Sequence, residues 1–357
     1  MRLNADSRDE FEAGTDAFNC GNFQEALKIW MPMGERGDDS AQCMLGHLYD
    51  NGKGVERSFK EAAFWYGLAA EQGEKWSQFC IGSMFDKGQG MPQNRRLAAI
   101  WYLKAARQGL PEAQFSIGQL YKTGQGVEKD LPTALEWFRA AAENGYREAQ
   151  VYLGICYEKG KGVEHSPARA LRWYQEAAWQ GDALAQCSLA EIYRRGEVVD
   201  KDIAEAIRWY RQAARQGFDQ AQFRLAQLYQ TGIGVAADTT AASVWFRKAA
   251  EQGHAESQLA LGIILINGSG VLRDVEEAAI WLRRAAARGL DKAARYLKLC
   301  GDSNLGGTLA PGPLFNIVRK DGKKFALTGP ELKAFMKDKQ FVSARMKSKD
   351  SRKGGVR

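Results

Sequence analysis

The sequence predicts an all-helical solenoid of tandem 36-residue helix-turn-helix repeats, with a small β-hairpin and helix appended near the C-terminal end. Two observations carry this prediction: a strict 36-residue period and, inside each period, two apolar stripes at helical spacing. Seven of the ten tryptophans share one register, with no insertion or deletion between them: Trp65, Trp101, Trp137, Trp173, Trp209, Trp245 and Trp281. A fixed period of this length is the signature of units that pack on their sequence neighbours.

Three further columns keep the phase of the tryptophans. Glutamine recurs at Gln42, Gln78, Gln114, Gln150, Gln186, Gln222 and Gln258. A small residue recurs at Gly46, Gly82, Gly118, Gly154, Ala190, Ala226 and Gly262. A glycine closes each unit at Gly73, Gly109, Gly145, Gly181, Gly217, Gly253 and Gly289. We interpret these columns as packing and turn positions, with the glutamines satisfying backbone groups of an adjacent loop.

The first helix of a unit is predicted by apolar residues on one face. Ala41, Leu45 and Leu48 fall at positions i, i+4 and i+7, which is one stripe of an α-helix. Gly52 and Gly54 then follow, and glycine readily adopts the left-handed conformation that ends a helix. This segment therefore predicts a helix, a tight turn and a loop.

The second helix has a clear predicted start. One column contains only residues whose side chains cap helix N-termini: Ser58, Asn94, Asp130, Ser166, Asp202, Asp238 and Asp274. A second apolar stripe follows each cap, as from Ala62 to Ala70 in the first full unit. Because neither helix can bury its stripe alone, adjacent units are expected to stack into one continuous core.

These columns also predict how the chain is divided. Residues 1–40 form a divergent first repeat, since Ala26 and Gly37 keep the phase although the loop between the helices is shorter. Residues 41–300 form seven repeats followed by a capping helix from Asp291 to Cys300. Atypical terminal units are expected because end repeats must present a polar outer face.

The C-terminal part departs from the repeat pattern. Residues 301–313 are rich in glycine and proline, which indicates a linker. Residues 314–342 predict a β-hairpin around the Asp321-Gly322 turn, followed by a helix from Leu332 to Lys339. Residues 343–357 are basic and polar, which is typical of a disordered tail.

Charge separates these two parts of the chain. Residues 301–357 contain 13 Lys or Arg and 5 Asp or Glu, which is a net charge of +8. The whole chain has a net charge of +7, so residues 1–300 carry a net charge of −1. A basic tail could meet nucleic acid, a membrane surface or an acidic partner. The interpretation we favour is a solubilising end, because its phenylalanines fit the core of the hairpin and helix rather than base stacking.

Composition narrows the class of protein. The N-terminal residues are polar, and no apolar run approaches the ~18 residues of a membrane helix, so we expect a cytoplasmic protein without a membrane span. The six cysteines are scattered, which favours reduced and mostly buried side chains over disulfides. Cysteines and histidines show no metal-ligand spacing, and we expect no cofactor and no metal.

The repeated motif resembles that of the Sel1-like repeat family, relatives of tetratricopeptide repeats. The pattern is Ala-Gln-x-x-Leu-Gly-x-x-Tyr-x-x-Gly-x-Gly-Val followed by Ala-x-x-Trp-Tyr-x-x-Ala-Ala-x-x-Gly, and residues 149–181 reproduce it in full. The resemblance covers about residues 8–300 and implies a right-handed α/α superhelix that acts as an adaptor in protein complexes. One unit departs from it, with Ala190 in the small-residue column and Glu197-Val198 in the turn, where we expect a different loop or a local bend.

We expect the functional residues at positions where the residue type differs from repeat to repeat, because the structural columns stay the same. On the first helices, the columns of residues 44, 47 and 51 are not needed for packing between repeats. The equivalent positions line the concave groove in related solenoids. Aromatic, apolar and charged side chains mix in three consecutive units, which predicts a partner-binding groove. Its residues are Tyr152, Ile155, Lys159, Glu191, Arg195, Arg224 and Gln227. The alternative is an ordinary solvated helix face, and the sequence leaves both open.

We therefore predict a non-catalytic scaffold or adaptor that holds one or more protein partners in this groove. The alternative within the binding class is a dedicated inhibitor or immunity-type antagonist of a single protein partner. Catalysis is not expected, because no nucleophile–base pair, metal cluster or nucleotide motif stands out from the repeats. The identity of the partner and the oligomeric state are not contained in the sequence.

Overall fold

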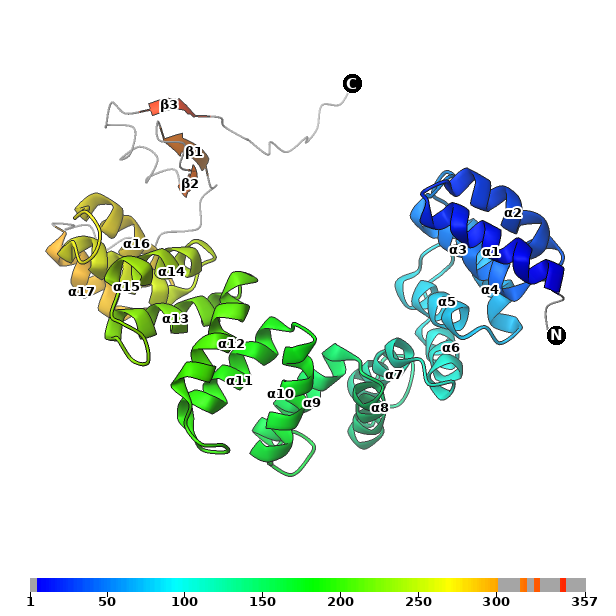
Figure 1. Ribbon diagram of the computed structural model, residues 1–357, viewed down its shortest axis with the longest axis horizontal. Helices are drawn as coiled ribbons and strands as arrows, with labels where there is room; N and C mark the ends of the chain where they lie inside the picture. Colours follow the sequence, from blue (N-terminus) through cyan, green and yellow to red (C-terminus); the bar gives the residue numbers. More distant parts are fainter. Residues whose placement is uncertain (1–4, 301–314, 320–323, 328–340, 345–357) are drawn as a thin grey trace, which may run out of the picture. The chain divides into compact units, whose positions relative to one another are not determined.

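The computed structural model describes residues 5–300, 315–319, 324–327 and 341–344. Figure 1 shows its helices following one another in pairs along the chain. The chain divides into two compact units, Met1–Asp202 and Ile203–Arg357, which are described separately below.

The first unit is built from α-helices alone in its described residues. Within this unit each helix packs against its neighbours in the chain, from α1 to α11. The helices are α1 (Ala5–Asn19), α2 (Phe23–Glu35), α3 (Asp39–Asn51), α4 (Phe59–Glu71), α5 (Lys75–Lys87), α6 (Arg95–Arg107), α7 (Pro111–Thr123), α8 (Leu131–Glu143), α9 (Arg147–Lys159), α10 (Pro167–Trp179) and α11 (Ala183–Arg195).

The second unit continues the helix pairs and ends in a small sheet. Its helices are α12 (Ile203–Arg215), α13 (Asp219–Thr231), α14 (Thr239–Glu251), α15 (Ala255–Asn267), α16 (Val275–Ala287) and α17 (Asp291–Leu299). Its strands are β1 (Phe315–Arg319), β2 (Lys324–Leu327) and β3 (Phe341–Ala344). The all-α solenoid predicted from the 36-residue period is confirmed.

Local signals set the helix ends. Each first helix of the seven repeats ends at a glycine with φ between +63° and +75°, the left-handed region that other residues avoid: Gly52, Gly88, Gly124, Gly160, Gly196, Gly232 and Gly268. Second helices begin at the predicted caps, whose side chains accept from the amide three residues on: Ser58, Asn94, Asp130, Ser166, Asp238 and Asp274. These two signals define helices of 13 residues in every repeat.

The small-residue column lets the two helices of a repeat approach closely. A Cβ added to Gly46 would lie 2.6 Å from the Tyr66 ring, and one added to Gly154 would lie 2.6 Å from the Tyr174 ring. The predicted tryptophan column is also confirmed as packing, since four of its members are buried and Trp101, Trp137 and Trp245 are half-buried. Large rings against small residues thus produce the interlocked core that the columns predict.

The glutamine column links each repeat to the preceding one. Gln78 donates its Nε2 hydrogen to the carbonyl of Ala70 at 3.1 Å, and its Oε1 accepts from Gln108 Nε2 at 2.9 Å. The same side-chain-to-carbonyl bond occurs at Gln42, Gln114, Gln150, Gln186, Gln222 and Gln258. The accepting carbonyl belongs to the last helical turn rather than to the predicted loop, because that turn leaves its carbonyls without helical partners.

The loop at Val198 differs from its equivalents, as expected from the sequence. In the other six loops the second glycine has φ between +71° and +77°: Gly54, Gly90, Gly126, Gly162, Gly234 and Gly270. No described non-glycine residue has positive φ, so Val198 takes another backbone conformation. The first glycine of the pair is retained as Gly196, and the helix still ends there.

The C-terminal strands form a three-stranded sheet in the order β2-β1-β3, with both pairs antiparallel. Strands β1 and β2 pair with Ile317 opposite Phe325, where the sequence analysis placed the hairpin. The Asp321-Gly322 turn and the helix predicted from Leu332 to Lys339 lie outside the described residues. Strand β3 was not predicted, and it takes in the first two residues of the segment assigned to the tail.

The structure also bears on the predictions about membrane spans and cysteines. Among the described helices, none combines the length and the apolar character needed to cross a membrane. Only Cys156 and Cys187 of the six cysteines are buried, and Cys20 is exposed. The prediction that most cysteines are buried was therefore only partly right.

Candidate functional site

The predicted partner-binding stripe lies along the first helices of the repeats. In all seven repeats its first two positions are half-buried and its third, at the helix end, is exposed. The exposed members are Asn51, Lys87, Thr123, Lys159, Arg195, Thr231 and Asn267. We refer to the columns of residues 44, 47 and 51 as the variable stripe.

Tyr152 on α9 is held in place by its neighbours. Its ring centroid lies 4.5 Å from that of Phe138, and Lys122 Nζ lies 4.6 Å from the Tyr152 centroid. Burial raises the pKa of Tyr152 to about 12, and its contact with Cys156 adds to this effect. The side chain is therefore a neutral phenol on a fixed ring, with half-buried Ile155 one turn further along the helix.

On α11 the stripe holds a charged cluster. Glu191 Oε2 accepts from Arg194 Nη2 at 2.7 Å and lies 3.6 Å from Arg195 Nε. The Glu191 side chain is 18% exposed, whereas that of Arg195 is 52% exposed. Arg195 therefore stays accessible while its guanidinium is oriented by a carboxylate. The sequence analysis missed Arg194, whose three-residue spacing from Glu191 is a recognisable signal.

Arg224 and Gln227 stand on α13 in the second unit. Arg224 Nη1 donates to Gln227 Oε1 at 3.1 Å, and Arg224 Cζ lies 5.7 Å from the Phe223 ring centroid. Both side chains are half-buried. They occupy the same two columns as Tyr152 and Ile155, and within their unit they contact one another.

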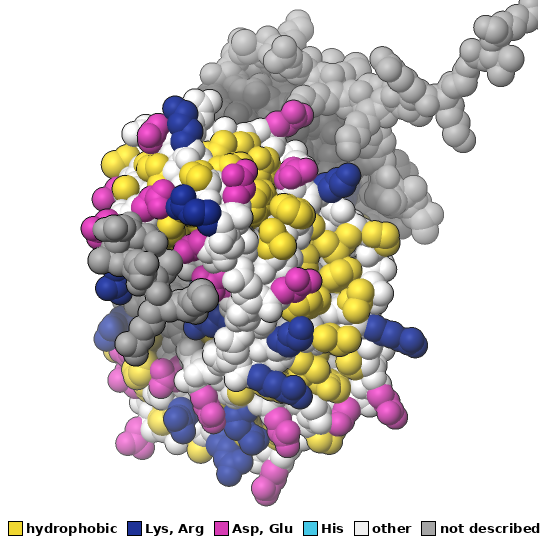
Figure 2. Space-filling model, turned by 90° about the vertical axis from the view of Figure 1, so that its right-hand side faces the viewer, with side chains coloured by type: hydrophobic (Ala, Val, Ile, Leu, Met, Phe, Trp, Pro, Cys, Tyr) yellow, Lys and Arg dark blue, Asp and Glu magenta, His cyan; other side chains and the backbone are white. Residues whose placement is uncertain are grey.

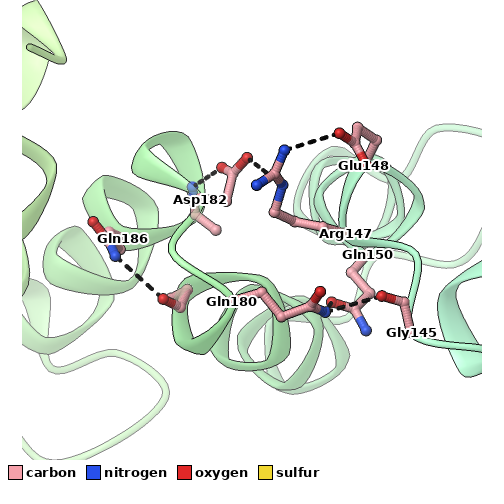
Figure 3. Close-up of polar contacts among 9 residues, drawn as sticks. Gly145, Arg147, Glu148, Gln150, Gln180, Asp182 and Gln186 are labelled. Carbon is pink, nitrogen blue, oxygen red and sulfur yellow. Dashed lines mark hydrogen bonds and ion pairs between the residues drawn. The ribbon is translucent and has the colours of Figure 1, made fainter. Parts of the chain in front are cut away.

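A polar network joins the start of α9 to the start of α11, as Figure 3 shows. Arg147 Nη2 donates to Glu148 Oε1 at 3.0 Å, and Arg147 Nε lies 3.8 Å from Asp182 Oδ2. Asp182 also accepts from the amide of Ala185 at 2.9 Å, which caps α11. This network was not predicted, although an aspartate before a helical stripe is a cap signal.

Hydrogen bonds of the glutamine side chains also join these helices. Gln180 Nε2 donates to Gln150 Oε1 at 2.8 Å and to the carbonyl of Gly145 at 3.0 Å. On the other side of α10, Gln186 of α11 donates to the carbonyl of Ala178 through a buried bond, so α9 and α11 are each tied to α10.

The comparisons with known proteins agree with this architecture. A family model described as Sel1 repeat matches residues 39–74, 77–110, 111–146, 147–182, 183–218, 219–254 and 255–290. The chain belongs to the Sel1 repeat family. No curated protein matches the chain. Sel1 repeat proteins are generally non-catalytic scaffolds for protein interaction.

Solved structures of other Sel1 repeat proteins are similar to this one. The crystal structure of c5321, a protective antigen of uropathogenic Escherichia coli with an SLR fold, is 30% identical with a TM-score of 0.61. That match covers 82% of this chain and 71% of the other. A Sel1 repeat protein from Oxalobacter formigenes is 33% identical with a TM-score of 0.58, covering 68% of this chain and 96% of its own.

Proposed function

We propose that this Sel1 repeat protein is a non-catalytic adaptor that binds a partner protein through the variable stripe of its first helices. In the first unit the contact residues are Tyr152, Ile155, Lys159, Glu191 and Arg195. In the second unit they are Arg224 and Gln227, which occupy equivalent columns. The support is that the repeated columns are used in stacking, so the stripe is where side chains vary without disturbing the fold.

The observation that carries the proposal is the fixed ring of Tyr152. A tyrosine held against Phe138 at 4.5 Å and Lys122 at 4.6 Å presents apolar area and a hydroxyl with few rotamers left to lose. Rigid aromatic side chains of this kind are typical anchors of protein interfaces.

Charge indicates the chemistry of the partner. Lys159 and Arg195 are exposed at the ends of neighbouring first helices, and Arg195 is oriented by Glu191. A partner surface that offers an apolar recess for Tyr152 and carboxylates for the two cations would complement this stripe. Such pairing contributes to specificity and association rate more than to affinity.

Charge reversal tests the stripe. We expect Arg195→Glu and Arg224→Glu, singly, to reduce capture of the native partner from cell extract by about tenfold or more, and together to abolish it. Arg172→Glu is the matched control, because Arg172 is an exposed arginine on the second helix α10. Unchanged capture by the double variant, or equal loss with Arg172→Glu, would remove the site; circular dichroism checks that each variant is folded.

The composition of the captured complex separates an adaptor from a dedicated antagonist. Several partners that bind the same chain, each lost on charge reversal, are the result expected of an adaptor. One partner in a tight one-to-one complex would instead indicate the inhibitor or immunity-type function. Native mass spectrometry of the purified complexes distinguishes these results.

A further inference from the structure

Four exposed cations lie together at the last helix of the repeat array. Arg288 follows the last residue of α16, and Lys292, Arg295 and Lys298 lie on α17. All four side chains are exposed. Within the part of the chain that the structure describes, none of the four forms an ion pair or a side-chain hydrogen bond. We refer to these four residues as the C-terminal basic face.

The charge of this segment differs from that of the repeats before it. Residues 283–298 contain 6 Lys or Arg and 1 Asp, which is a net charge of +5. The equivalent segments of the preceding repeats have net charges between −2 and +2: 67–82, 103–118, 139–154, 175–190, 211–226 and 247–262. On the side of the molecule viewed in Figure 2, which carries the N-terminal helices, basic and acidic side chains are interspersed. Stacking of the repeats therefore does not require a basic segment.

Two of the cations occupy columns that are covered in every repeat. The position of Arg295 holds a buried or half-buried apolar residue in all seven: Cys43, Phe79, Phe115, Val151, Cys187, Phe223 and Leu259. The position of Lys298 belongs to the small-residue column that contacts the following second helix. No second helix follows α17 among the described residues, so both positions are open. An end repeat needs a polar surface of neither particular sign, since α1 mainly presents carboxylates, at Asp9, Glu12 and Asp16.

The carboxylates around this face do not neutralise it. Asp291 is exposed in the first turn of α17, where a negative charge stabilises the helix N-terminus. The helices packed against α17 carry exposed Glu256 and Glu276, Glu277 paired with Arg247, and half-buried Arg283 and Arg284. Six cations of residues 283–298 thus lie near four carboxylates, of which one already has a cationic partner.

The side chains beside the cations indicate the class of anion. Among the described side chains of α16 and α17, no large apolar one is exposed. A helix that binds a lipid surface inserts apolar side chains, and a protein interface is centred on apolar or aromatic anchors. Tyr296, the aromatic residue of α17, is half-buried against the core around Leu282, so it is not available to stack on a base. The remaining attraction is that between cations and a regular array of phosphates.

We propose that the C-terminal basic face binds the phosphate backbone of a nucleic-acid duplex without reading its sequence. Lys292, Arg295 and Lys298 are spaced three residues apart, so they lie on one side of α17 and can contact one strand. Each contact neutralises a phosphate and releases its condensed counterion, which is the source of the affinity. The residues proposed for partner capture take no part, so the two bindings are independent properties of the chain.

Fluorescence anisotropy of a short labelled DNA duplex, titrated with the full chain, tests this proposal. We expect binding that weakens about 100-fold between 50 mM and 200 mM salt, as four phosphate contacts imply. A second duplex of unrelated sequence should bind equally well.

Neutralising the face should remove most of this binding. We expect Lys292→Gln/Arg295→Gln/Lys298→Gln to lower the affinity at 50 mM salt by about tenfold or more and to make the salt dependence shallower, because three of four contacts are lost. Lys292→Arg with Lys298→Arg keeps the charge and should retain binding. Circular dichroism should be unchanged in both variants, since the substituted side chains are exposed.

The matched control removes the same charge from the C-terminal tail. Arg345→Gln/Lys347→Gln/Lys349→Gln should bind the duplex within about threefold of the wild type. A wild-type chain that does not bind the duplex, or equal losses in the two triple variants, would overturn the proposal. Binding to phosphatidylserine–phosphatidylcholine vesicles or to polyglutamate, without binding to the duplex, would do the same. Partner capture is measured on the same variants, so failure of either proposal is recognised separately.

Discussion

The cap of α15 shows how a single residue links local structure to solution conditions. His254 precedes the helix, and its Nδ1 accepts from the amide of Ser257 at 3.2 Å. Nε2 lies 3.1 Å from Gln220 Oε1, so it holds the proton and donates it to that oxygen. Accepting at Nδ1 requires a neutral ring. Burial accordingly lowers the pKa of His254, although nearby Glu256 opposes the shift.

This cap predicts that acid weakens the second unit. Because the folded-state pKa of His254 is lowered, the unfolded chain binds more protons below about pH 6.5, and stability falls as pH drops through that window. His254→Asn keeps an uncharged cap, as Asn94 does for α6. We expect the melting temperature of this variant to fall less than that of the wild type between pH 8 and pH 5.5.

The melting temperatures are compared by calorimetry or circular dichroism. His47 also has a pKa lowered by burial, so His47→Asn serves as the control for a histidine without a capping role. If His254→Asn and the wild type lose the same stability on acidification, the cap is not the source of the effect.

At the level of elements, the loops place each first helix against the preceding second helix. Gly126 has φ of +77°, and a Cβ there would overlap the carbonyl of Arg95 at the start of α6. Gly145, with φ of +84°, has nothing within 4 Å of a Cβ. Gly126 is therefore required both for its left-handed backbone conformation and for the close approach of the Arg95 carbonyl. Gly145 is required for its backbone conformation alone.

Two alanine substitutions separate these roles. Gly145→Ala should cost about 1–2 kcal/mol of unfolding free energy, the penalty for a left-handed non-glycine residue. Gly126→Ala pays the same penalty and must also displace backbone, so we expect it to cost about 1–3 kcal/mol more. Urea unfolding of both variants measures the difference, and equal losses would show that the loop moves aside freely.

At the scale of the whole molecule, each repeat contacts its sequence neighbours through the same bonds. Gln114 donates to the carbonyl of Ala106, and Gln150 donates to that of Ala142, at equivalent positions. Removing one complete period would therefore bring together surfaces that already fit. Stability in such an array is approximately a sum of repeat and interface contributions.

This regularity predicts that deletion of residues 111–146 leaves a folded protein. Gln150 would then meet the carbonyl of Ala106, and we expect unchanged helicity per residue and cooperative melting. Deletion of residues 111–128 is the control, because it removes α7 and its loop and leaves α8 without the first helix of its repeat. Loss of cooperative melting in the full-period deletion would show that the repeats are not interchangeable.

Much of the frame could be predicted because its signals are local. The caps at Ser58 and Asp130 and the terminating glycines each act within one repeat, and the tryptophan spacing shows that the same unit recurs along the chain. What the sequence analysis missed depends on contacts between helices, such as Arg147 with Asp182. Strand β3 was missed for the same reason, since its pairing with β1 joins distant segments.

The period, the helix ends and the order of the repeats follow from the sequence by itself, because backbone conformation and apolar spacing are properties of neighbouring residues. The tertiary structure alone decided which side chains stay exposed after stacking. Tyr152 is fixed by Phe138, whereas Phe64 is left open to solvent, although both are aromatic residues on 13-residue helices. Burial depends on what a neighbouring helix covers, and that is settled only when the helices pack together.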